Sequence, residues 1–140
     1  MSDESTKQPR HTAILSVGSN IEPQTNVRRA AEILAQEHRL LDESRFIQTA
    51  PDGFQDQPDF LNGAFYVATN DDYDTFNQYL KAVEKRLGRV KGPIKSGPRT
   101  IDLDIIVWNG RVVHADYPAK DYTRDPVDEI LGKHQLSIED

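Results

Sequence analysis

The chain has 140 residues, a formal net charge of −6 and no cysteine, and 36% of its residues are hydrophobic. This length suits one domain with a real core, and the lack of cysteine excludes disulfides, thiolate metal sites and a cysteine nucleophile. No apolar run approaches the roughly 20 residues that a membrane-spanning helix needs, and the acidic charge disfavours a nucleic-acid partner. We therefore expect a cytoplasmic protein that binds neither membrane nor nucleic acid.

The first ten residues are polar and lack the apolar stretch of a signal peptide, so we expect a disordered lead over 1–10 and a single domain over 11–140. Strands are expected where branched and aromatic residues cluster, and helices where apolar residues recur every three or four positions. In chain order these patterns predict a strand over 11–17, a helix over 23–38, a strand over 46–49, a strand over 60–69, a helix over 73–87 and a strand over 99–108. Loops rich in Gly and Pro precede the third and fourth strands.

The segment after the fourth strand begins with Asn109-Gly110, a strong two-residue hairpin turn, so residues 111–114 should pair back antiparallel. The order β-α-β-β-α-β is that of the ferredoxin-like arrangement. We therefore predict an α+β fold, a ferredoxin-like α/β sandwich whose antiparallel sheet carries both helices on one face and a groove on the other. Farther on, the polar stretch 116–125 is expected to be a loop and 126–131 a short helix.

Two carboxylates, Asp102 and Asp104, stand in the fourth predicted strand. Side chains alternate along a strand, so both aspartates share one face while Ile101, Leu103, Ile105 and Val107 share the other. Carboxylates placed in this way can reach a common pair of divalent cations. The alternative is a pair of surface aspartates on the wet face of an edge strand.

A basic cluster precedes the aspartates. Between residues 81 and 99 there are seven basic side chains and one acid, Glu84. Such a cluster on an acidic protein suggests a small polyanion such as nucleotide phosphate, although a solvated helix face is the alternative. Magnesium prefers oxygen ligands and bridges phosphates, so the two features together indicate phosphoryl-type transfer from a nucleoside triphosphate.

The loop and strand over 49–62 supply a ring in Phe60, an amide in Asn62 and backbone groups around Asp52. These groups suit a flat heterocycle, because the ring can stack on it while the amide and the main chain read its edge. A core aromatic and a strand-edge amide are the alternatives.

Four short motifs follow one another along the chain: Gly18-Ser19-Asn20, Gln55-Asp56-Gln57-Pro58-Asp59-Phe60-Leu61-Asn62, Leu87-Gly88-Arg89 and Gly97-Pro98-Arg99-Thr100-Ile101-Asp102-Leu103-Asp104. Their order and spacing carry a family resemblance. Together they resemble the 6-hydroxymethyl-7,8-dihydropterin pyrophosphokinases of folate biosynthesis, over about residues 12–113. The resemblance implies a ferredoxin-like fold and transfer of pyrophosphate from ATP to the pterin's hydroxymethyl group, with release of AMP. It also implies direct attack on the β-phosphorus, without a covalent enzyme intermediate.

The resemblance also implies a set of site residues. Two Mg²⁺ ions would lie on Asp102 and Asp104, with ATP as co-substrate. The pterin would be held by Thr49, Asp52 (through its backbone), Phe60 and Asn62. ATP would be held by Glu84, Lys91, Lys95, Arg99 and the backbone near Ile105. The catalytic set is then Asp102, Asp104, Arg99, Lys91 and Lys95. Small-molecule substrates and a monomer are expected.

The segment after the hairpin departs from the family's pattern, which has a Pro-His pair, then an Arg and an aromatic. There the His and Arg contact ATP, and the aromatic closes the pterin sandwich. Here no His follows Pro118 and no Phe follows Arg124, which leaves Lys120, Tyr122 or Arg124 as substitutes. The departure leaves open a pterin- or nucleotide-binding relative with lost or altered catalysis, or a different pterin alcohol as substrate. A ferredoxin-like RNA-binding module is disfavoured, because its usual aromatic signature is missing.

Overall fold

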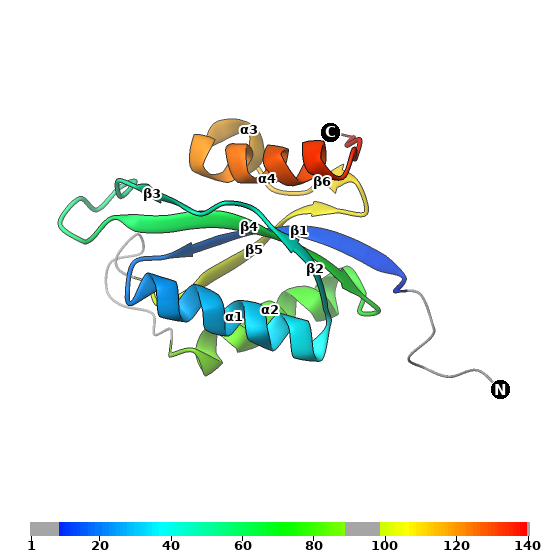
Figure 1. Cartoon of the computed structure of the whole chain (residues 1–140), viewed down its shortest axis with the longest axis horizontal. Helices are drawn as coiled ribbons and strands as arrows, with labels where there is room; N and C mark the ends of the chain where they lie inside the picture. Colours follow the sequence, from blue (N-terminus) through cyan, green and yellow to red (C-terminus); the bar gives the residue numbers. More distant parts are fainter. Residues whose placement is uncertain (1–8, 89–98, 140) are drawn as a thin grey trace.

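A computed structural model describes residues 9–88 and 99–139, and within these residues the chain forms one sheet between two layers of helices (Figure 1). The strands are β1 (His11–Ser19), β2 (Arg39–Glu43), β3 (Ile47–Thr49), β4 (Phe60–Thr69), β5 (Asp102–Trp108) and β6 (Arg111–Val112). The helices are α1 (Pro23–Glu37), α2 (Tyr73–Arg86), α3 (Asp116–Ala119) and α4 (Asp121–Lys133). The sheet order is β2-β4-β1-β5-β6, with β3 also paired to β4, and each pairing is antiparallel. The predicted α+β, ferredoxin-like class is confirmed, whereas residues 1–8 of the expected lead lie outside the described residues.

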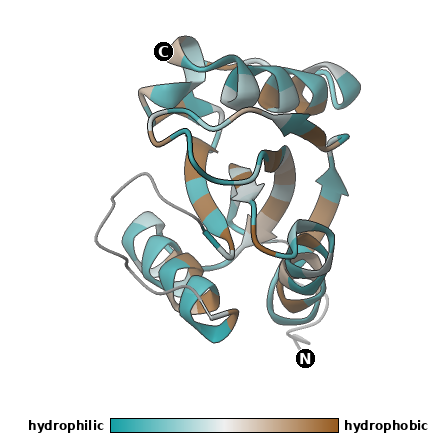
Figure 2. Cartoon of the chain, turned by 90° about the vertical axis from the view of Figure 1, so that its left-hand side faces the viewer, coloured by the Kyte–Doolittle hydropathy of each residue, from teal (hydrophilic) through white to brown (hydrophobic). Residues whose placement is uncertain are grey.

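Helices α1 and α2 cover one face of the sheet, as predicted (Figure 1). Their apolar residues recur at helical spacing and pack against the inward side chains of the central strands. In Figure 2 the ribbons of these helices and strands carry alternating brown and teal bands, which mark hydrophobic and hydrophilic residues. The core members from these elements are Val27, Ala30, Leu34, Phe76, Leu80, Val83, Leu15, Val17, Phe65 and Leu103. Helix α2 begins at a capped end, because the Asp72 carboxylate accepts a hydrogen bond from Thr75 N at 2.8 Å.

The opposite face is where the prediction was wrong. Residues 116–125 were expected to be a loop, but they form α3 and the first turn of α4, and the short helix expected over 126–131 extends from Asp121 to Lys133. The stretch is polar and holds Pro126 inside the helix, so its local signal is weak. Tertiary packing holds the helix, since Val127, Ile130 and Leu131 bury against Ile14, Ala64 and Ile106 of the sheet. Helices α3 and α4 thus cover part of the face on which the groove was expected, and cavities remain beside them.

The alternation of side chains along β5 breaks once. Leu15 of β1 pairs with Ile105 while Ile14 pairs with Val107, so Ile106 is an extra residue in a β-bulge. Before the bulge, Leu103 and Ile105 point to the α1/α2 core. After it, Ile106 and Val107 both lie in the α4 core, so the prediction that Val107 shares a face with Leu103 was wrong. Asp102 and Asp104 precede the bulge and do share a face, as predicted.

Two further differences lie at the margins of the sheet. Strand β2 was not predicted, because the edge sequence Arg-Leu-Leu-Asp-Glu lacks the branched residues typical of strands. The Asn109-Gly110 hairpin is confirmed, with φ angles of 51° and 81° at the two turn residues, but β6 ends at Val112 rather than residue 114. None of the helices in the described part of the chain has the length and apolar character needed to cross a bilayer.

Candidate active site

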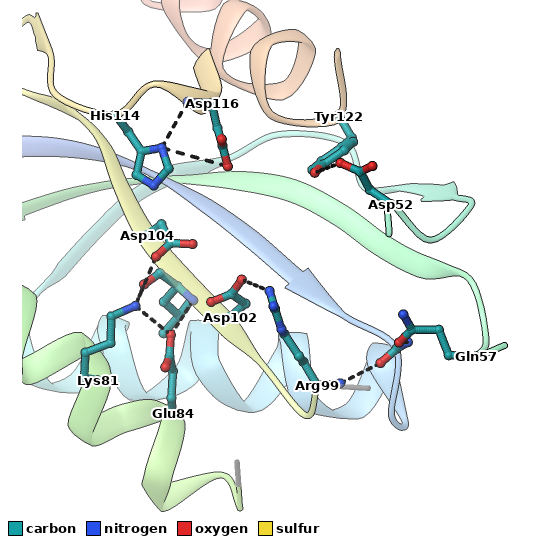
Figure 3. Close-up of polar contacts among 12 residues, drawn as sticks. Asp52, Gln57, Lys81, Glu84, Arg99, Asp102, Asp104, His114, Asp116 and Tyr122 are labelled. Carbon is teal, nitrogen blue, oxygen red and sulfur yellow. Dashed lines mark hydrogen bonds and ion pairs between the residues drawn. The ribbon is translucent and has the colours of Figure 1, made fainter. Parts of the chain in front are cut away.

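A cavity opens at the end of the sheet, between β5 and the loop that joins β3 to β4 (Figure 3). It has a volume of about 100 Å³. The residues that line it come from the strands, the loop after β3, the approach to β5 and helices α3 and α4: Ser16, Gly18, Thr49, Ala50, Asp52, Phe60, Asn62, Arg99, Asp102, Asp104, Asp116, Tyr122 and Thr123. The fold therefore brings both aspartates of β5 into one hollow with the four residues predicted to hold a pterin.

The carboxylates of Asp102 and Asp104 face this hollow, and each has a cation beside it. Arg99 Nη1 lies 2.9 Å from Asp102 Oδ2, and Lys81 Nζ lies 3.0 Å from Asp104 Oδ1. The aspartate side chains are 22% and 34% exposed, so water and small solutes reach them. Arg99 is thus next to the aspartate pair, as predicted, whereas Lys81 was not among the predicted site residues.

Helix α2 supports β5 from its open edge through Lys81 and Glu84 (Figure 3). The Glu84 carboxylate is buried and accepts hydrogen bonds from Leu103 N at 2.7 Å and from Lys81 Nζ at 3.1 Å. Lys81 Nζ also donates to Leu103 O at 2.9 Å. Burial disfavours the charged amine, but the charges of Asp104 and Glu84 outweigh it and raise the pKa of Lys81. The two side chains satisfy both backbone groups of Leu103 on the edge that β1 leaves unpaired.

The heterocycle side of the cavity is built on β3 and β4. Asn62 is buried, and its amide donates to Thr49 Oγ1 at 2.5 Å across the β3–β4 pair. Phe60 begins β4 and lines the same wall. These three residues were predicted to act together, and the strand register brings them together.

The loop after β3 is fastened to helix α4 by a carboxylate. Asp52 Oδ2 lies 2.5 Å from Lys120 Nζ and accepts a hydrogen bond from Tyr122 Oη at 3.1 Å. The hydrogen bond from Lys120 lowers the pKa of Asp52, and burial raises the pKa of Tyr122. We refer to these three residues as the Asp52 latch. Through it Tyr122 lines the cavity together with Phe60.

Asn20 explains why the Gly-Ser-Asn motif after β1 matters. Its Oδ1 accepts a hydrogen bond from Arg99 N at 2.8 Å, and its Nδ2 donates to Gln57 Oε1 at 2.9 Å and to Pro58 O at 3.0 Å. Ser19 Oγ donates to Thr100 O at 2.6 Å. The motif therefore ties the loop before β4 to the approach of β5, which fixes the two sides of the cavity relative to each other.

His114 follows the hairpin and was not predicted as a site residue. Its Nδ1 accepts a hydrogen bond from Asp116 N at 3.1 Å, and Figure 3 shows its ring beside Asp116 and above Asp104. Asp116 also lines the cavity. The signal available in the sequence is the position of His114 directly after the hairpin, whereas the family's His stands after a proline that corresponds to Pro118.

Comparison with known proteins identifies the family. A sequence model described as 7,8-dihydro-6-hydroxymethylpterin-pyrophosphokinase (HPPK) matches residues 14–132, a range that includes the whole cavity lining given above. The chain belongs to the HPPK family. It is 35% identical over 116 residues to "Folic acid synthesis protein fol1" of Schizosaccharomyces pombe, covering 81% of this chain and 15% of that relative.

Two bacterial relatives carry the name 2-amino-4-hydroxy-6-hydroxymethyldihydropteridine pyrophosphokinase. The Bacillus subtilis protein is 32% identical over 100 residues, covering 69% of this chain and 59% of that protein. The Haemophilus influenzae protein is 28% identical over 132 residues, covering 86% and 82%. The match thus spans less than two thirds of the length of the fission yeast and Bacillus relatives.

The remaining residues that the HPPK resemblance assigned are placed as follows. Lys91 and Lys95 lie outside the described residues. Ile105 lies on β5 with its side chain buried in the α1/α2 core. Within the described residues, no group of three or more His, Cys, Asp or Glu side chains can hold a metal ion. Two adjacent, partly exposed carboxylates nevertheless fit magnesium, which keeps several waters and takes its other ligands from substrate phosphates.

Proposed function

We propose that this chain is a Mg²⁺-dependent pyrophosphokinase that acts on 6-hydroxymethyl-7,8-dihydropterin in folate biosynthesis. The hydroxymethyl oxygen attacks the β-phosphorus of ATP, the bond between that phosphorus and the α-phosphate oxygen breaks, and AMP leaves. One observation carries the proposal: the aspartate pair and the Phe60–Asn62 wall line the same cavity. The proposal therefore places both reacting groups at one site, because the pterin wall and the aspartate pair line the same cavity. Membership of the HPPK family supports the choice of reaction.

The pterin is held on the β3–β4 side in this proposal. Its ring stacks between Phe60 and Tyr122, which both line the cavity. Asn62 and Thr49 read the polar edge of the ring, and the backbone at Asp52 contributes a further contact. Because the Asn62–Thr49 hydrogen bond is already formed, the Asn62 amide and the Thr49 hydroxyl are oriented before the pterin binds.

The triphosphate lies over β5. Asp102 and Asp104 would hold two Mg²⁺ ions, which neutralise phosphate charge and orient the reacting phosphorus when they are bound. Arg99 offers a guanidinium to the phosphates, and Lys91 and Lys95 add two ammonium groups from the preceding loop. Glu84 and the backbone of Ile105 are proposed to contact the nucleoside. Catalysis then rests on positioning and charge stabilisation.

The segment after the hairpin is proposed to complete both subsites. His114, Lys120 and Tyr122 follow the hairpin in the order of the family's His, Arg and aromatic. Tyr122 lines the cavity, and His114 lies beside Asp116, which also lines it (Figure 3). In this assignment His114 takes the place of the His that is missing after Pro118. Lysine lacks the two-pronged fork of arginine, so Lys120 binds phosphate as a point charge.

The test is a turnover assay with ATP, Mg²⁺ and the dihydropterin, read as AMP formed. Asp102→Ala and Asp104→Ala should each lower turnover by about 100-fold or more, because the ion ligands act on charge that develops during transfer. Asp74→Ala, which removes an exposed carboxylate of α2 outside the cavity, should leave turnover unchanged. Absence of AMP with the wild-type chain would refute the proposed reaction.

A binding protein without catalysis is the second candidate. The observation that favours it is the pairing of each aspartate with a cation of the chain itself. Calorimetry separates the two, since a binder takes up pterin without Mg²⁺-dependent release of AMP. A monomeric state, a cytoplasmic location and the restriction to small-molecule partners stay predictions.

A further inference from the structure

Lys81 holds an unusual position on α2, because one ammonium group contacts three oxygens of the site. Nζ lies 3.0 Å from Asp104 Oδ1, 3.1 Å from Glu84 Oε2 and 2.9 Å from Leu103 O (Figure 3). The three donors of the ammonium are thus matched by three acceptors. The Lys81 side chain is 41% exposed, so the contact with Asp104 lies at the border of the cavity and not in the core.

The position matters for any cation that approaches Asp104. Asp104 already shares a positive charge with Glu84, and Asp102 has the guanidinium of Arg99 at 2.9 Å. A divalent ion arriving alone at Asp104 meets a carboxylate whose negative charge is partly offset by Lys81, and it is repelled by the nearby ammonium. The same ion arriving with a polyphosphate brings negative charge of its own, which offsets this repulsion.

We propose that Lys81 is a built-in counter-ion of Asp104 that keeps divalent cations off the ligand-free site and releases Asp104 when cation and polyphosphate arrive together. The inference rests on the proposed function, which puts the Mg²⁺ ions on Asp102 and Asp104. Release requires little rearrangement, because Lys81 retains its bonds to Glu84 and Leu103 O when Asp104 turns to the ion. Lys81 is therefore a positioning residue: it holds the Asp104 carboxylate in place before the substrates bind.

The test titrates Mg²⁺ alone, by calorimetry, into the full chain without nucleotide. Lys81→Gln removes the charge but keeps a donor for Glu84, and it should bind Mg²⁺ about tenfold more tightly than wild type, or better. Lys81→Arg keeps the charge and should bind as weakly as wild type. The increase in Mg²⁺ affinity should be absent in the double variant Lys81→Gln/Asp104→Asn, and this result would locate the ion at Asp104. Equal affinities of wild type and Lys81→Gln would overturn the proposal.

Two further measurements keep the outcome decisive. With a non-hydrolysable ATP analogue present, the difference between wild type and Lys81→Gln should shrink, and a difference that persists would contradict release by the polyphosphate. If Lys81→Gln does not fold, the side-chain ¹⁵N resonance of Lys81 in wild type replaces it. That resonance should shift with Mg²⁺ plus analogue but not with Mg²⁺ alone, and a shift at micromolar Mg²⁺ alone would refute the inference.

The turnover assay separates this inference from the proposed function. If wild type forms AMP, the proposed function stands, and the Mg²⁺ titration alone decides the role of Lys81. If wild type forms none, the proposed function fails whatever the titration gives.

Discussion

Gly18 offers the sharpest test of how the pterin wall is built. It pairs with Asn62 across β1 and β4, and a Cβ placed on it would lie 2.8 Å from Asn62 Oδ1. Real Cβ contacts are longer than this, so in Gly18→Ala the Asn62 amide must move. Asn62 is buried and its Nδ2 donates to Thr49 at 2.5 Å, so the movement strains or breaks that hydrogen bond.

The expected loss of stability in Gly18→Ala follows from two costs, the overpacking at Asn62 and the weakened Asn62–Thr49 hydrogen bond. Overpacking a well-filled site costs about 1–3 kcal/mol, and loss of a hydrogen bond costs about 0.5–1.5 kcal/mol. Since a side-chain amide moves more easily than backbone, we expect Gly18→Ala to lower the free energy of unfolding by about 1–2 kcal/mol. Displacement of the Asn62 amide, which is proposed to bind the polar edge of the pterin, should weaken pterin binding by about tenfold or more. A tenfold change corresponds to about 1.4 kcal/mol.

Urea unfolding and pterin calorimetry measure the two effects, with Gly132→Ala as the matched control. A Cβ on Gly132 of α4 meets nothing within 4 Å, so helix propensity should stabilise this variant by about 0.5 kcal/mol without changing pterin affinity. If Gly18→Ala binds pterin as tightly as wild type, Asn62 does not read the pterin edge, and the reasoning is refuted.

Three further predictions concern the loop after β3 and helix α4. Asp52→Asn should weaken pterin binding about threefold by loosening the latch, while Asp56→Asn in the same loop should not; equal affinities of the two variants would contradict a role for the latch. Tyr122→Leu should weaken pterin binding by about tenfold and Tyr122→Phe by less than about threefold, because stacking needs the ring and not the hydroxyl; similar losses would contradict stacking. The hydrogen bond with His134 lowers the pKa of Asp42 from 3.8 to about 2. Its contribution to stability is therefore complete above pH 3.8 and is lost as the pH falls through about 2, so Asp42→Asn should flatten the stability profile in that window, as measured by thermal unfolding.

The central strands could be predicted because their local pattern agrees with their final environment. The bounds of β4 match the prediction residue for residue, since a run of apolar and aromatic residues is buried on both faces. Asp102 and Asp104 could be placed on one face by simple alternation. The bulge at Ile106 could not, because nothing in the run Ile-Ile-Val marks which residue is the extra one. Strand β5 packs against helices on both faces of the sheet, and the packing of these two layers determines which residue forms the bulge.

The cations of the site illustrate a different limit. Arg99 stands three residues before Asp102, so its proximity follows from the chain itself. Lys81 belongs to a helix with two other basic residues, Lys85 and Arg86, and the spacing gives no reason to prefer it over Lys85 as a partner of β5. The choice is made by the rotation of α2 that buries Phe76, Leu80 and Val83. That rotation turns Lys81 and Glu84 toward the open edge of β5, where Leu103 offers one acceptor and one donor.

Helix α4 shows why the second half of the cavity was the hardest part to foresee. Its first turn carries Tyr122, and Lys120, the residue before the helix, contacts Asp52 of the loop after β3. Neither residue has a local signal, because a polar stretch with an internal proline is equally typical of a loop. What makes it a helix is the fit of Val127 and Ile130 against Ile14 and Ile106. The bulge that brings Ile106 to this face is therefore coupled to the site. Ile106 packs in the apolar cluster that holds α4, and α4 carries Tyr122, which lines the cavity together with Phe60. A substitution at Ile106 should accordingly disturb pterin binding without touching the pterin.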